Sequence, residues 1–300
     1  MVPGQPRLVG TIEGSLMRVL ITGAGGQVGH ELLRVFGTGG HEVAGFDHAS
    51  LDIMNRDAVR AAIVEFHPDA IVHSAAWTAV DACEGDPDRA FAVNAMGTRF
   101  VVEASRLVDA AVHYISTDYV FDGTKDSAYL EWDQTNPQSV YGASKLAGEH
   151  ELGENSSIIR TSWVCGFHGP NMVKTILRIA AENDTLSFVD DQRGCPTFAD
   201  DLAAMIAQLV VERRTGVFHV TNAGPVSWYE FAREVLMASG QDPDRVLPVS
   251  TADLQPPRPA PRPANSVLDH AALRLSGIDT MADFREPLRR LVAALTSATD

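Results

Sequence analysis

Residues 18–36 read RVLITGAGGQVGHELLRVF, and this stretch decides the fold. Its first five residues form a short apolar, β-branched run, which is typical of a buried parallel strand. Three glycines follow at the spacing G-x-x-G-x-x-G, and an amphipathic helix begins among them. We expect Gly23 to permit a tight turn, Gly26 to let the backbone approach a pyrophosphate, and Gly29 to let the helix pack closely on the sheet. A glycine triplet between a buried strand and a helix therefore predicts a dinucleotide-binding site.

The alternation of strands and helices continues outward from this stretch. Further apolar runs that predict buried strands lie at residues 42–46, 70–73, 111–116 and 157–161. This order predicts an α/β fold with a Rossmann-type, doubly wound parallel sheet. After Thr161 the regular alternation loosens, so we expect the dinucleotide-binding domain to span residues 17–161. Residues 1–16 lack periodicity and predict a disordered N-terminal arm.

The second predicted strand ends at Asp47, which bears on the choice of cofactor. An acidic residue at this position accepts hydrogen bonds from the adenosine ribose and disfavours a 2′-phosphate, so the residues alone favour NADH. The third strand leads to Ala75 and Ala76, whose small side chains either let the cofactor lie against the backbone or simply pack. A long helix is predicted over residues 88–108, and Asn94 within it is expected to be solvated. A side chain that faces the sheet and bridges backbone groups is the less favoured interpretation.

Tyr141 and Lys145 stand four residues apart in VYGASKLAGE, so they lie on one face of the helix that this segment predicts. Thr117 follows the strand predicted at 111–116, at the end of the sheet where ligands bind. A phenol, an ammonium group and a hydroxyl together suit a proton transfer that accompanies a hydride transfer. A free tyrosine titrates at about 10. We expect the Lys145 ammonium to lower the pKa of Tyr141 by favouring its phenolate.

Charge and composition exclude several classes of protein. The net charge of −15 over 300 residues argues against nucleic-acid binding, which depends on clustered Lys and Arg. No apolar run is long enough to span a bilayer and no signal peptide is recognisable, so we expect no membrane association and a cytoplasmic location. Cys83, Cys165 and Cys195 have neither disulfide nor zinc spacing, and we expect buried thiols.

One further segment stands out by its composition. Residues 256–263 read PPRPAPRP. A solvated linker is one interpretation of such a proline-rich stretch. In the other, Arg258 and Arg262 grip a diphosphate, for which the guanidinium group is well suited.

Seven strings follow one another along the chain: GQVGHEL, AAWTAVDACE, ISTDYVFDG, VYGASKLAGE, IIRTSWV, DDQRGCPT and RPANS. With them the chain resembles the extended short-chain dehydrogenases/reductases that act on nucleotide sugars, and within these the dTDP-4-dehydrorhamnose reductase family. The resemblance covers Met17 to near the C-terminus. It implies that residues 162–300 form a smaller α/β domain that mainly binds substrate, with some segments returning to the dinucleotide-binding domain. It implies reduction of the 4-keto group of dTDP-4-dehydro-6-deoxy-L-mannose (dTDP-4-dehydrorhamnose) to dTDP-L-rhamnose by hydride transfer from NAD(P)H, with Tyr141 as proton donor.

The resemblance also implies roles for individual residues. Catalysis would fall to Thr117, Tyr141 and Lys145. The expected cofactor contacts, with the glycine turn and Asp47 taken from the motif itself, are Gly23, Gly26, Gln27, Val28, Gly29, Asp47, Asp52, Ile53, Ala75, Ala76, Thr78, Tyr141 and Lys145. The expected substrate contacts are Val80, Thr117, Asp118, Tyr119 and Trp163.

The resemblance also gives expectations about the cofactor, a bound metal and the oligomeric state. Family members commonly accept NADPH, often with NADH as well, so we expect NADPH with NADH possible. Some members pair through a magnesium site built from three glutamates. Here Glu31 matches the first, Asp200 occupies the second and no third aligns. We therefore expect no metal, and either a monomer or a homodimer.

The sequence leaves two other functions open. A 4-epimerase of the same superfamily would hold an oxidised cofactor tightly and need no stoichiometric reductant. A non-catalytic regulatory subunit of the same fold, like the β subunit of methionine adenosyltransferase, would instead bind a protein partner. The presence of Thr117, Tyr141 and Lys145 together argues against the second, because a binding module need not keep all three.

Overall fold

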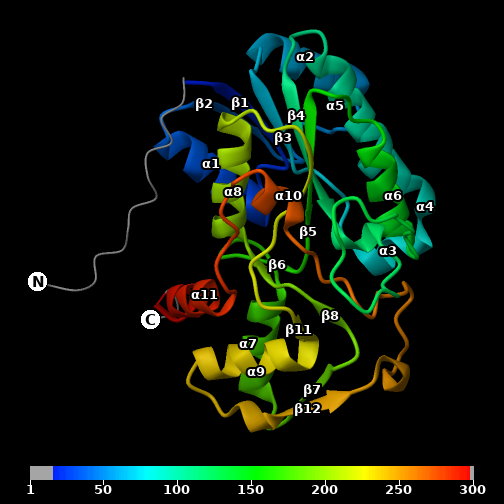
Figure 1. Cartoon of the computed structure of the whole chain (residues 1–300), viewed down its shortest axis with the longest axis vertical. Coiled ribbons are helices and arrows are strands. Elements are labelled where there is room, and N and C mark those ends of the chain that lie inside the picture. Colours follow the sequence, from blue (N-terminus) through cyan, green and yellow to red (C-terminus); the bar gives the residue numbers. More distant parts are fainter. Residues whose placement is uncertain (1–15, 298–300) are drawn as a thin grey trace, which may run out of the picture.

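A six-stranded sheet with the order β2-β1-β3-β4-β5-β10 forms the centre of the molecule (Figure 1). The structure is a computed structural model that describes residues 16–297, so the arm expected at residues 1–16 lies outside the described residues except for Leu16. The strands are β1 (Arg18–Thr22), β2 (Glu42–Phe46), β3 (Ala70–His73), β4 (Ala111–Thr117), β5 (Ser156–Thr161) and β10 (Gly216–His219). All neighbouring strands are parallel, which confirms the predicted doubly wound fold. The order reverses between β1 and β3, so a ligand crevice is expected at their carboxyl ends.

Helices cover both faces of this sheet, α1 and α8 on one face and α2, α5 and α6 on the other (Figure 1). Their bounds are α1 (Gln27–Thr38), α8 (Ala199–Val211), α2 (Arg56–Phe66), α5 (Gly97–Ser105) and α6 (Val140–Glu149). Strand β1 contributes side chains to the hydrophobic cores on both faces of the sheet, because successive side chains of a strand point to opposite faces. Val19 and Ile21 belong to the core under α1 and α8, whereas Leu20 belongs to the core under α2 and α5.

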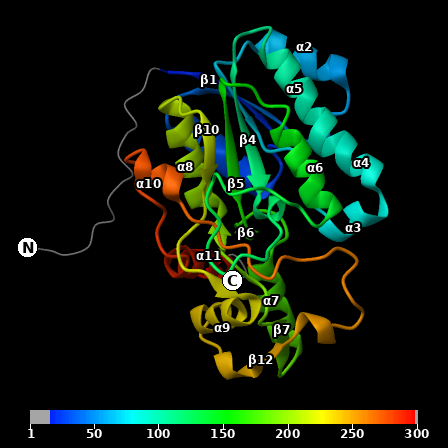
Figure 2. The same cartoon turned by 45° about the vertical axis from the view of Figure 1, so that its right-hand side comes forward.

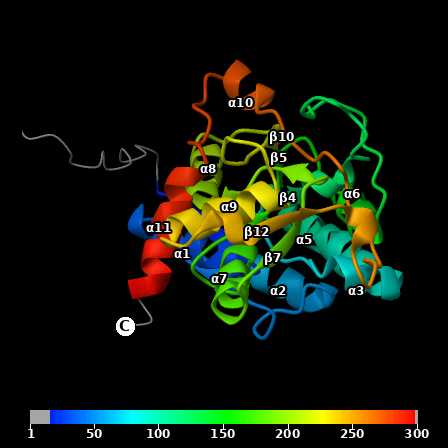
Figure 3. The ribbon, with the colours of Figure 1, turned by 90° about the horizontal axis from the view of Figure 1, so that it is seen from below.

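The chain after β5 returns to this sheet through α8 and β10 and also builds a smaller lobe around α7, α9 and α11 (Figures 2 and 3). The remaining elements of this half are β6 (Val164–Cys165), α7 (Met172–Glu182), β7 (Leu186–Val189), β8 (Arg193–Gly194), β9 (Thr197–Phe198), β11 (Val226–Ser227), α9 (Trp228–Ala238), η3 (Pro243–Arg245), β12 (Val246–Val249), η4 (Thr251–Asp253), α10 (Ala271–Leu275) and α11 (Arg285–Ser297). Val173, Phe231 and Leu288 join these three helices in a core of their own. None of the helices between residues 16 and 297 is both long and apolar enough to cross a bilayer.

The long helix predicted over residues 88–108 is present, since the backbone stays helical from Pro87 to Ser105. It follows α3 (Val80–Gly85) and consists of α4 (Pro87–Phe91), a π-helical turn η1 (Ala92–Met96) that was not predicted, and α5. A π-helical turn accommodates one extra residue and so changes which side chains face inward. Asn94, in the middle of this turn, is only 1% exposed, and the prediction that it is solvated was wrong.

Helix α6 lies directly against β4 and the segment that follows it. A Cβ on Gly148 would collide with the Tyr114 hydroxyl and lie 2.5 Å from the main-chain oxygen of Asn94. The end of the helix is also held by a buried ion pair. Glu149 accepts hydrogen bonds from Arg160 Nε (2.9 Å) and Nη2 (2.7 Å) and from Ser116 Oγ (2.6 Å). The helix is thereby attached to both β4 and β5.

Removing one member of this buried pair should destabilise the fold, because the other charge would remain buried without a partner. We predict that Arg160→Met lowers the free energy of unfolding by about 3–5 kcal/mol, measured by urea titration. Arg56→Gln is the matched control, since it breaks the exposed pair with Glu103 and should cost less than about 1 kcal/mol. Equal losses in the two variants would contradict a structural role for the buried pair.

Candidate active site

The turn between β1 and α1 is a glycine cradle at the carboxyl edge of the sheet. Gly23 has a φ of 70°, which glycine adopts without strain. A Cβ at Gly23 would lie 2.6 Å from the main-chain nitrogen of Ala75, and one at Gly29 would collide with the main chain of Gly23 and Ala24. Gly26 is exposed at the N-cap of α1, so no side chain covers the helix N-terminus. This surface fits a pyrophosphate, which helix N-termini bind through main-chain N–H groups.

Asp47 lies at the rim of the same cradle. A Cβ on Gly25 would be 3.2 Å from the Cβ of Asp47. The carboxylate accepts hydrogen bonds from the Ser50 hydroxyl (2.7 Å) and main-chain nitrogen (2.8 Å), and these bonds lower the pKa of Asp47. The side chain is exposed. An ionised acceptor therefore stands where the adenosine ribose is expected.

The other residues predicted to contact the cofactor differ in how far they are buried. Gln27 turns toward the smaller lobe, where its Nε2 donates to the Val164 carbonyl (3.5 Å) and its Oε1 accepts from Asn171 Nδ2 (3.0 Å). Ala75 and Ala76 are half-buried in the loop after β3. Of the remaining four, Ile53 is buried, Val28 is half-buried, and Asp52 and Thr78 are exposed.

Tyr141, Lys145 and Thr117 come together where α6 meets the end of β4. Ser139 caps the helix by accepting from the Gly142 main-chain nitrogen (3.1 Å). Tyr141 is 9% exposed and Lys145 is 2% exposed. Lys145 Nζ donates to the Ile115 carbonyl at 2.7 Å, and the Thr117 hydroxyl is close enough to Tyr141 to affect its pKa. The spacing in the sequence therefore predicted this cluster correctly.

The pKa values in the cluster differ from the expectation. Burial raises the pKa of Tyr141 well above its ordinary value, and the Thr117 hydroxyl acts in the opposite direction. The prediction that the pKa of Tyr141 is lowered was wrong, because burial of the phenol outweighs the opposing influences. Burial lowers the pKa of Lys145 to about 7. The Tyr141 phenol therefore stays protonated at neutral pH, which is the form that a proton donor requires.

Asp118 determines where the single proton of the Thr117 hydroxyl points. Thr117 Oγ1 donates to Asp118 Oδ1 at 2.9 Å and accepts from the Tyr119 main-chain nitrogen at 3.2 Å. Asp118 is 2% exposed, and this burial raises the pKa of its carboxyl to about 6. While Asp118 is ionised, the Thr117 hydroxyl donates its proton in a hydrogen bond to the carboxylate. A protonated Asp118 can donate instead and leave the Thr117 proton for another acceptor.

Two of the predicted substrate residues, Val80 and Tyr119, pack beside Tyr141, whereas Trp163 belongs to the smaller lobe. The rings of Tyr119 and Tyr141 meet edge to face with centroids 5.7 Å apart. Asp118, bonded to Thr117, is close enough to both tyrosines to affect their pKa values. Trp163 has a φ of 48° and stacks on Trp228 with centroids 3.5 Å apart.

Asn94 is a member of the site that the sequence did not reveal. Its Oδ1 accepts from the Trp77 main-chain nitrogen (2.8 Å), and its Nδ2 donates to the Trp77 carbonyl (3.1 Å) and to Ser144 Oγ (2.9 Å). The side chain thus ties the loop after β3, which flanks the cradle, to the helix that carries Tyr141. The sequence contains no local signal for the π-helical turn that places it.

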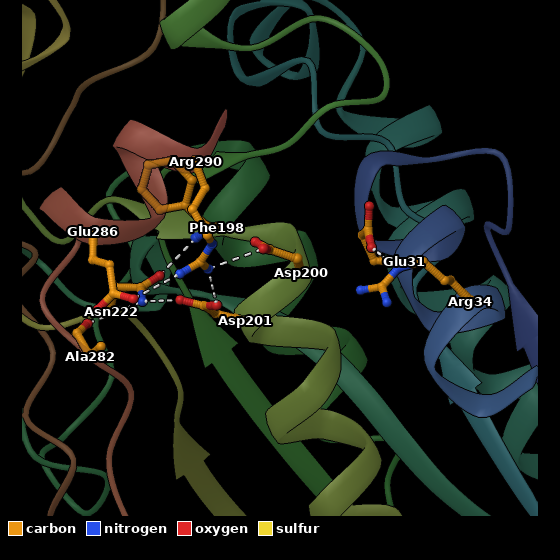
Figure 4. A network of polar contacts seen from close by, with 9 residues as sticks. All are labelled: Glu31, Arg34, Phe198, Asp200, Asp201, Asn222, Ala282, Glu286 and Arg290. Carbon is orange, nitrogen blue, oxygen red and sulfur yellow. Dashed lines mark hydrogen bonds and ion pairs between the residues drawn. The ribbon is translucent and has the colours of Figure 1, made fainter. Parts of the chain in front are cut away.

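The carboxylates considered for magnesium are paired with arginines. Glu31 bonds to Arg34 at 2.7 Å on α1, and Asp200 pairs with Arg290 of α11 at 3.1 Å (Figure 4). Arg290 also bonds to Asp201 at 2.6 Å, so its guanidinium joins α11 to the start of α8. Within residues 16–297, no group of three or more His, Cys, Asp or Glu side chains is placed to hold a metal ion.

A doubly wound sheet with a glycine cradle, a Tyr–Lys pair and a threonine at the strand end defines the class of protein: an NAD(P)H-dependent oxidoreductase with the extended short-chain dehydrogenase/reductase fold. A family model described as RmlD substrate binding domain matches residues 17–297. The dTDP-4-dehydrorhamnose reductase of Streptomyces griseus is 41% identical over 290 residues, which cover 94% of this chain and 92% of that protein. The chain therefore belongs to the dTDP-4-dehydrorhamnose reductase family, and the predicted resemblance is confirmed.

Two further relatives bear on structure and substrate. A solved structure of a dTDP-4-dehydrorhamnose reductase from Bacillus anthracis in complex with NADP is 40% identical, with a TM-score of 0.89 and coverage of 93% of this chain and 99% of that one. A probable dTDP-4,6-dihydroxy-2-methyloxan-3-one 4-ketoreductase from Streptomyces antibioticus is 40% identical over 290 residues, covering 94% of this chain and 97% of that protein. Similarity at this level thus includes proteins named for different keto sugars.

The raised pKa of Asp118 predicts how stability varies with pH. The folded state binds this proton more tightly than the unfolded chain, so stability falls as the pH rises from 3.8 to about 6. We predict that the wild type loses on the order of 1–3 kcal/mol relative to Asp118→Asn across this interval, measured by urea unfolding at each pH. A difference that did not vary with pH would contradict the titration of Asp118 in the fold.

Proposed function

We propose that this chain reduces the 4-keto group of dTDP-4-dehydrorhamnose to give dTDP-L-rhamnose, with NADPH as the preferred reductant and Tyr141 as the proton donor. The observation that carries the proposal is the buried, protonated Tyr141 phenol with the Thr117 hydroxyl beside it and Lys145 one helical turn away. The names of the Streptomyces griseus and Bacillus anthracis proteins, and the NADP bound to the latter, support it.

The residues around the glycine cradle fit a dinucleotide. Gly23, Gly26 and Gly29 leave room for the pyrophosphate over the N-terminus of α1. Asp47 is placed to accept from the 3′-hydroxyl of the adenosine ribose, which NADPH and NADH both carry, and it keeps NADH possible as the reductant. Further contacts are expected from Gln27, Val28, Asp52, Ile53, Ala75, Ala76 and Thr78. When bound there, NADPH supplies the hydride. Lys145 would turn its ammonium group from the Ile115 carbonyl to the nicotinamide ribose and so orient the ring.

The chain itself supplies the proton. Tyr141 donates from its hydroxyl to the keto oxygen, and the Lys145 ammonium stabilises the phenolate that remains. Thr117 donates a second hydrogen bond to the same oxygen, where negative charge develops. For that hydrogen bond the Thr117 hydroxyl would have to turn from the Asp118 carboxylate to the keto oxygen. The sugar would be held by Val80, Tyr119 and Trp163, the last against its apolar face.

Removing the Tyr141 hydroxyl should impair turnover and leave binding intact. We predict that Tyr141→Phe lowers kcat by about 10²–10⁴, the range for loss of a general acid. NADPH oxidation with dTDP-4-dehydrorhamnose measures kcat, and fluorescence titration measures the Kd for NADPH. Tyr229→Phe on α9, whose hydroxyl contacts Arg233, is the control and should keep wild-type kcat. A Tyr141→Phe enzyme with near wild-type kcat would refute the assignment.

The same assay separates the competing functions. Reduction of another dTDP-4-keto sugar in preference to dTDP-4-dehydrorhamnose would favour a 4-ketoreductase like the Streptomyces antibioticus relative. Sugar conversion without consumption of NADPH or NADH would indicate a 4-epimerase. A stoichiometric protein partner, together with no reduction of any keto sugar, would indicate a regulatory subunit.

A further inference from the structure

The stacked side chains of Trp163 and Trp228, here called the indole pair, connect the end of the central sheet to the smaller lobe. Trp163 comes two residues after Thr161, which pairs with Thr117 in the register of β5 and β4. It therefore lies near the strand end that carries the Thr117 hydroxyl. Trp228 is the first residue of α9 in the smaller lobe, and Ser227 caps that helix.

Both faces of the Trp163 indole are covered. The Trp228 ring lies parallel to it, with centroids 3.5 Å apart and an interplanar angle of 7°, so this face is filled. A Cβ on Gly194 would lie 2.7 Å from Cε2, 2.8 Å from Nε1 and 2.9 Å from Cζ2 of Trp163. Cε2 is bonded to the other two atoms and is the nearest of the three, so Gly194 approaches over the ring and not at its edge. A sugar can therefore lie on the Trp163 indole only after Trp228 or Gly194 has moved.

The stacked arrangement carries two costs. The φ of 48° at Trp163 is in the left-handed region, which bulky residues rarely adopt. Aromatic rings also prefer offset or edge-to-face contacts to a parallel sandwich, because their quadrupoles repel one another in the sandwich. An arrangement with these costs gives way more readily to a ligand than a relaxed one does.

The main chain around Trp163 is fixed, so the side chains are the parts that can move. The Trp163 carbonyl accepts from the Thr197 main-chain nitrogen (3.3 Å), and Ser162 Oγ donates to the Cys195 carbonyl (2.7 Å).

Of the two neighbours of Trp163, Trp228 is the more easily moved. Gly194 is held in β8 by its pairing with Val226 of β11. Trp228 is half-buried on the first turn of α9, where its ring meets Phe231 edge to face with centroids 6.0 Å apart. The face of Trp163 under Trp228 is therefore the one that a ligand can uncover.

We propose that Trp228 is a gate for the sugar: it occupies the face of Trp163 to which the sugar binds, and sugar binding separates the two rings. The inference rests on the proposed function, since it takes a 6-deoxy keto sugar as substrate. The sugar replaces an indole on an apolar surface, so a sugar with a more polar ring face opens the pair less readily. Trp228 is thus a positioning residue that acts through Trp163 and favours deoxy sugars.

Fluorine NMR of the full chain labelled with 5-fluorotryptophan tests the gate directly. The four tryptophans give four resonances, which single Trp→Phe variants assign. Saturating dTDP-L-rhamnose should move the Trp228 resonance downfield, because the ring loses the shielding of its stacked partner. The same concentration of dTDP, which has no sugar, should leave it in place. Trp132, whose side chain is 62% exposed, is the internal control and should not respond to either ligand.

The possible outcomes separate the gate from the proposed reaction. A Trp228 resonance that stays in place while calorimetry shows dTDP-L-rhamnose bound would overturn the gate and leave the reaction standing. An equal shift with dTDP alone would overturn its assignment to the sugar. A chain that binds no dTDP-L-rhamnose would overturn both.

Steady-state kinetics provide a second test, because a residue that competes with the sugar affects KM and not kcat. Trp228→Leu should lower the KM for dTDP-4-dehydrorhamnose by about threefold to tenfold and keep kcat within about twofold. Trp228→Phe, which restores a smaller ring, should give a KM between those of Trp228→Leu and the wild type. Trp132→Phe should leave both constants unchanged, and an unchanged Kd for NADPH shows that each variant is folded. A raised KM in Trp228→Leu would overturn the gate, since Trp228 would then only support Trp163.

Discussion

Helix α6 can lie against β4 because residues 142 and 148 have no side chains. A Cβ on Gly142 would collide with the Tyr119 carbonyl, and one on Gly148 with the Tyr114 hydroxyl. This close approach buries Tyr141 and Lys145 at the end of β4, and the Glu149–Arg160 pair and Asn94 then hold the helix there. The position and the protonation state of Tyr141, the proposed proton donor, both depend on this close packing of the helix.

Burial is also the main electrostatic influence on the site. It raises the pKa of Tyr141 and of Asp118 and lowers that of Lys145, so each group is shifted toward its neutral form. A neutral phenol is the form that a proton donor requires. Asp81 represents the opposite case, because hydrogen bonds from Arg262 hold its pKa below the ordinary value.

Local patterns in the sequence predicted the parts of the site that rest on local geometry. The strand, glycine turn and helix at residues 18–36 obey rules of backbone conformation, and the Tyr141–Lys145 spacing follows from helical periodicity. Asn94, Asp81 and the Thr117–Asp118 bond were not foreseen for a physical reason. Each depends on partners far along the chain or on a π-helical turn, and propensity and periodicity carry no information about either. The predicted direction of the Tyr141 pKa shift was wrong for the same reason, because desolvation depends on tertiary packing.

The central claim is that close packing of α6 on β4 sets the geometry of proton transfer, and the kcat of Gly148→Ala tests it most directly. A Cβ there must move the helix, and a displacement of about 1 Å in a reacting group can cost about 10²-fold in rate. The account predicts a fall in kcat of at least about tenfold with an unchanged Kd for NADPH, while Gly153→Ala, at a site with no atom within 4 Å of the new Cβ, keeps wild-type kcat. Wild-type kcat in Gly148→Ala would contradict the account.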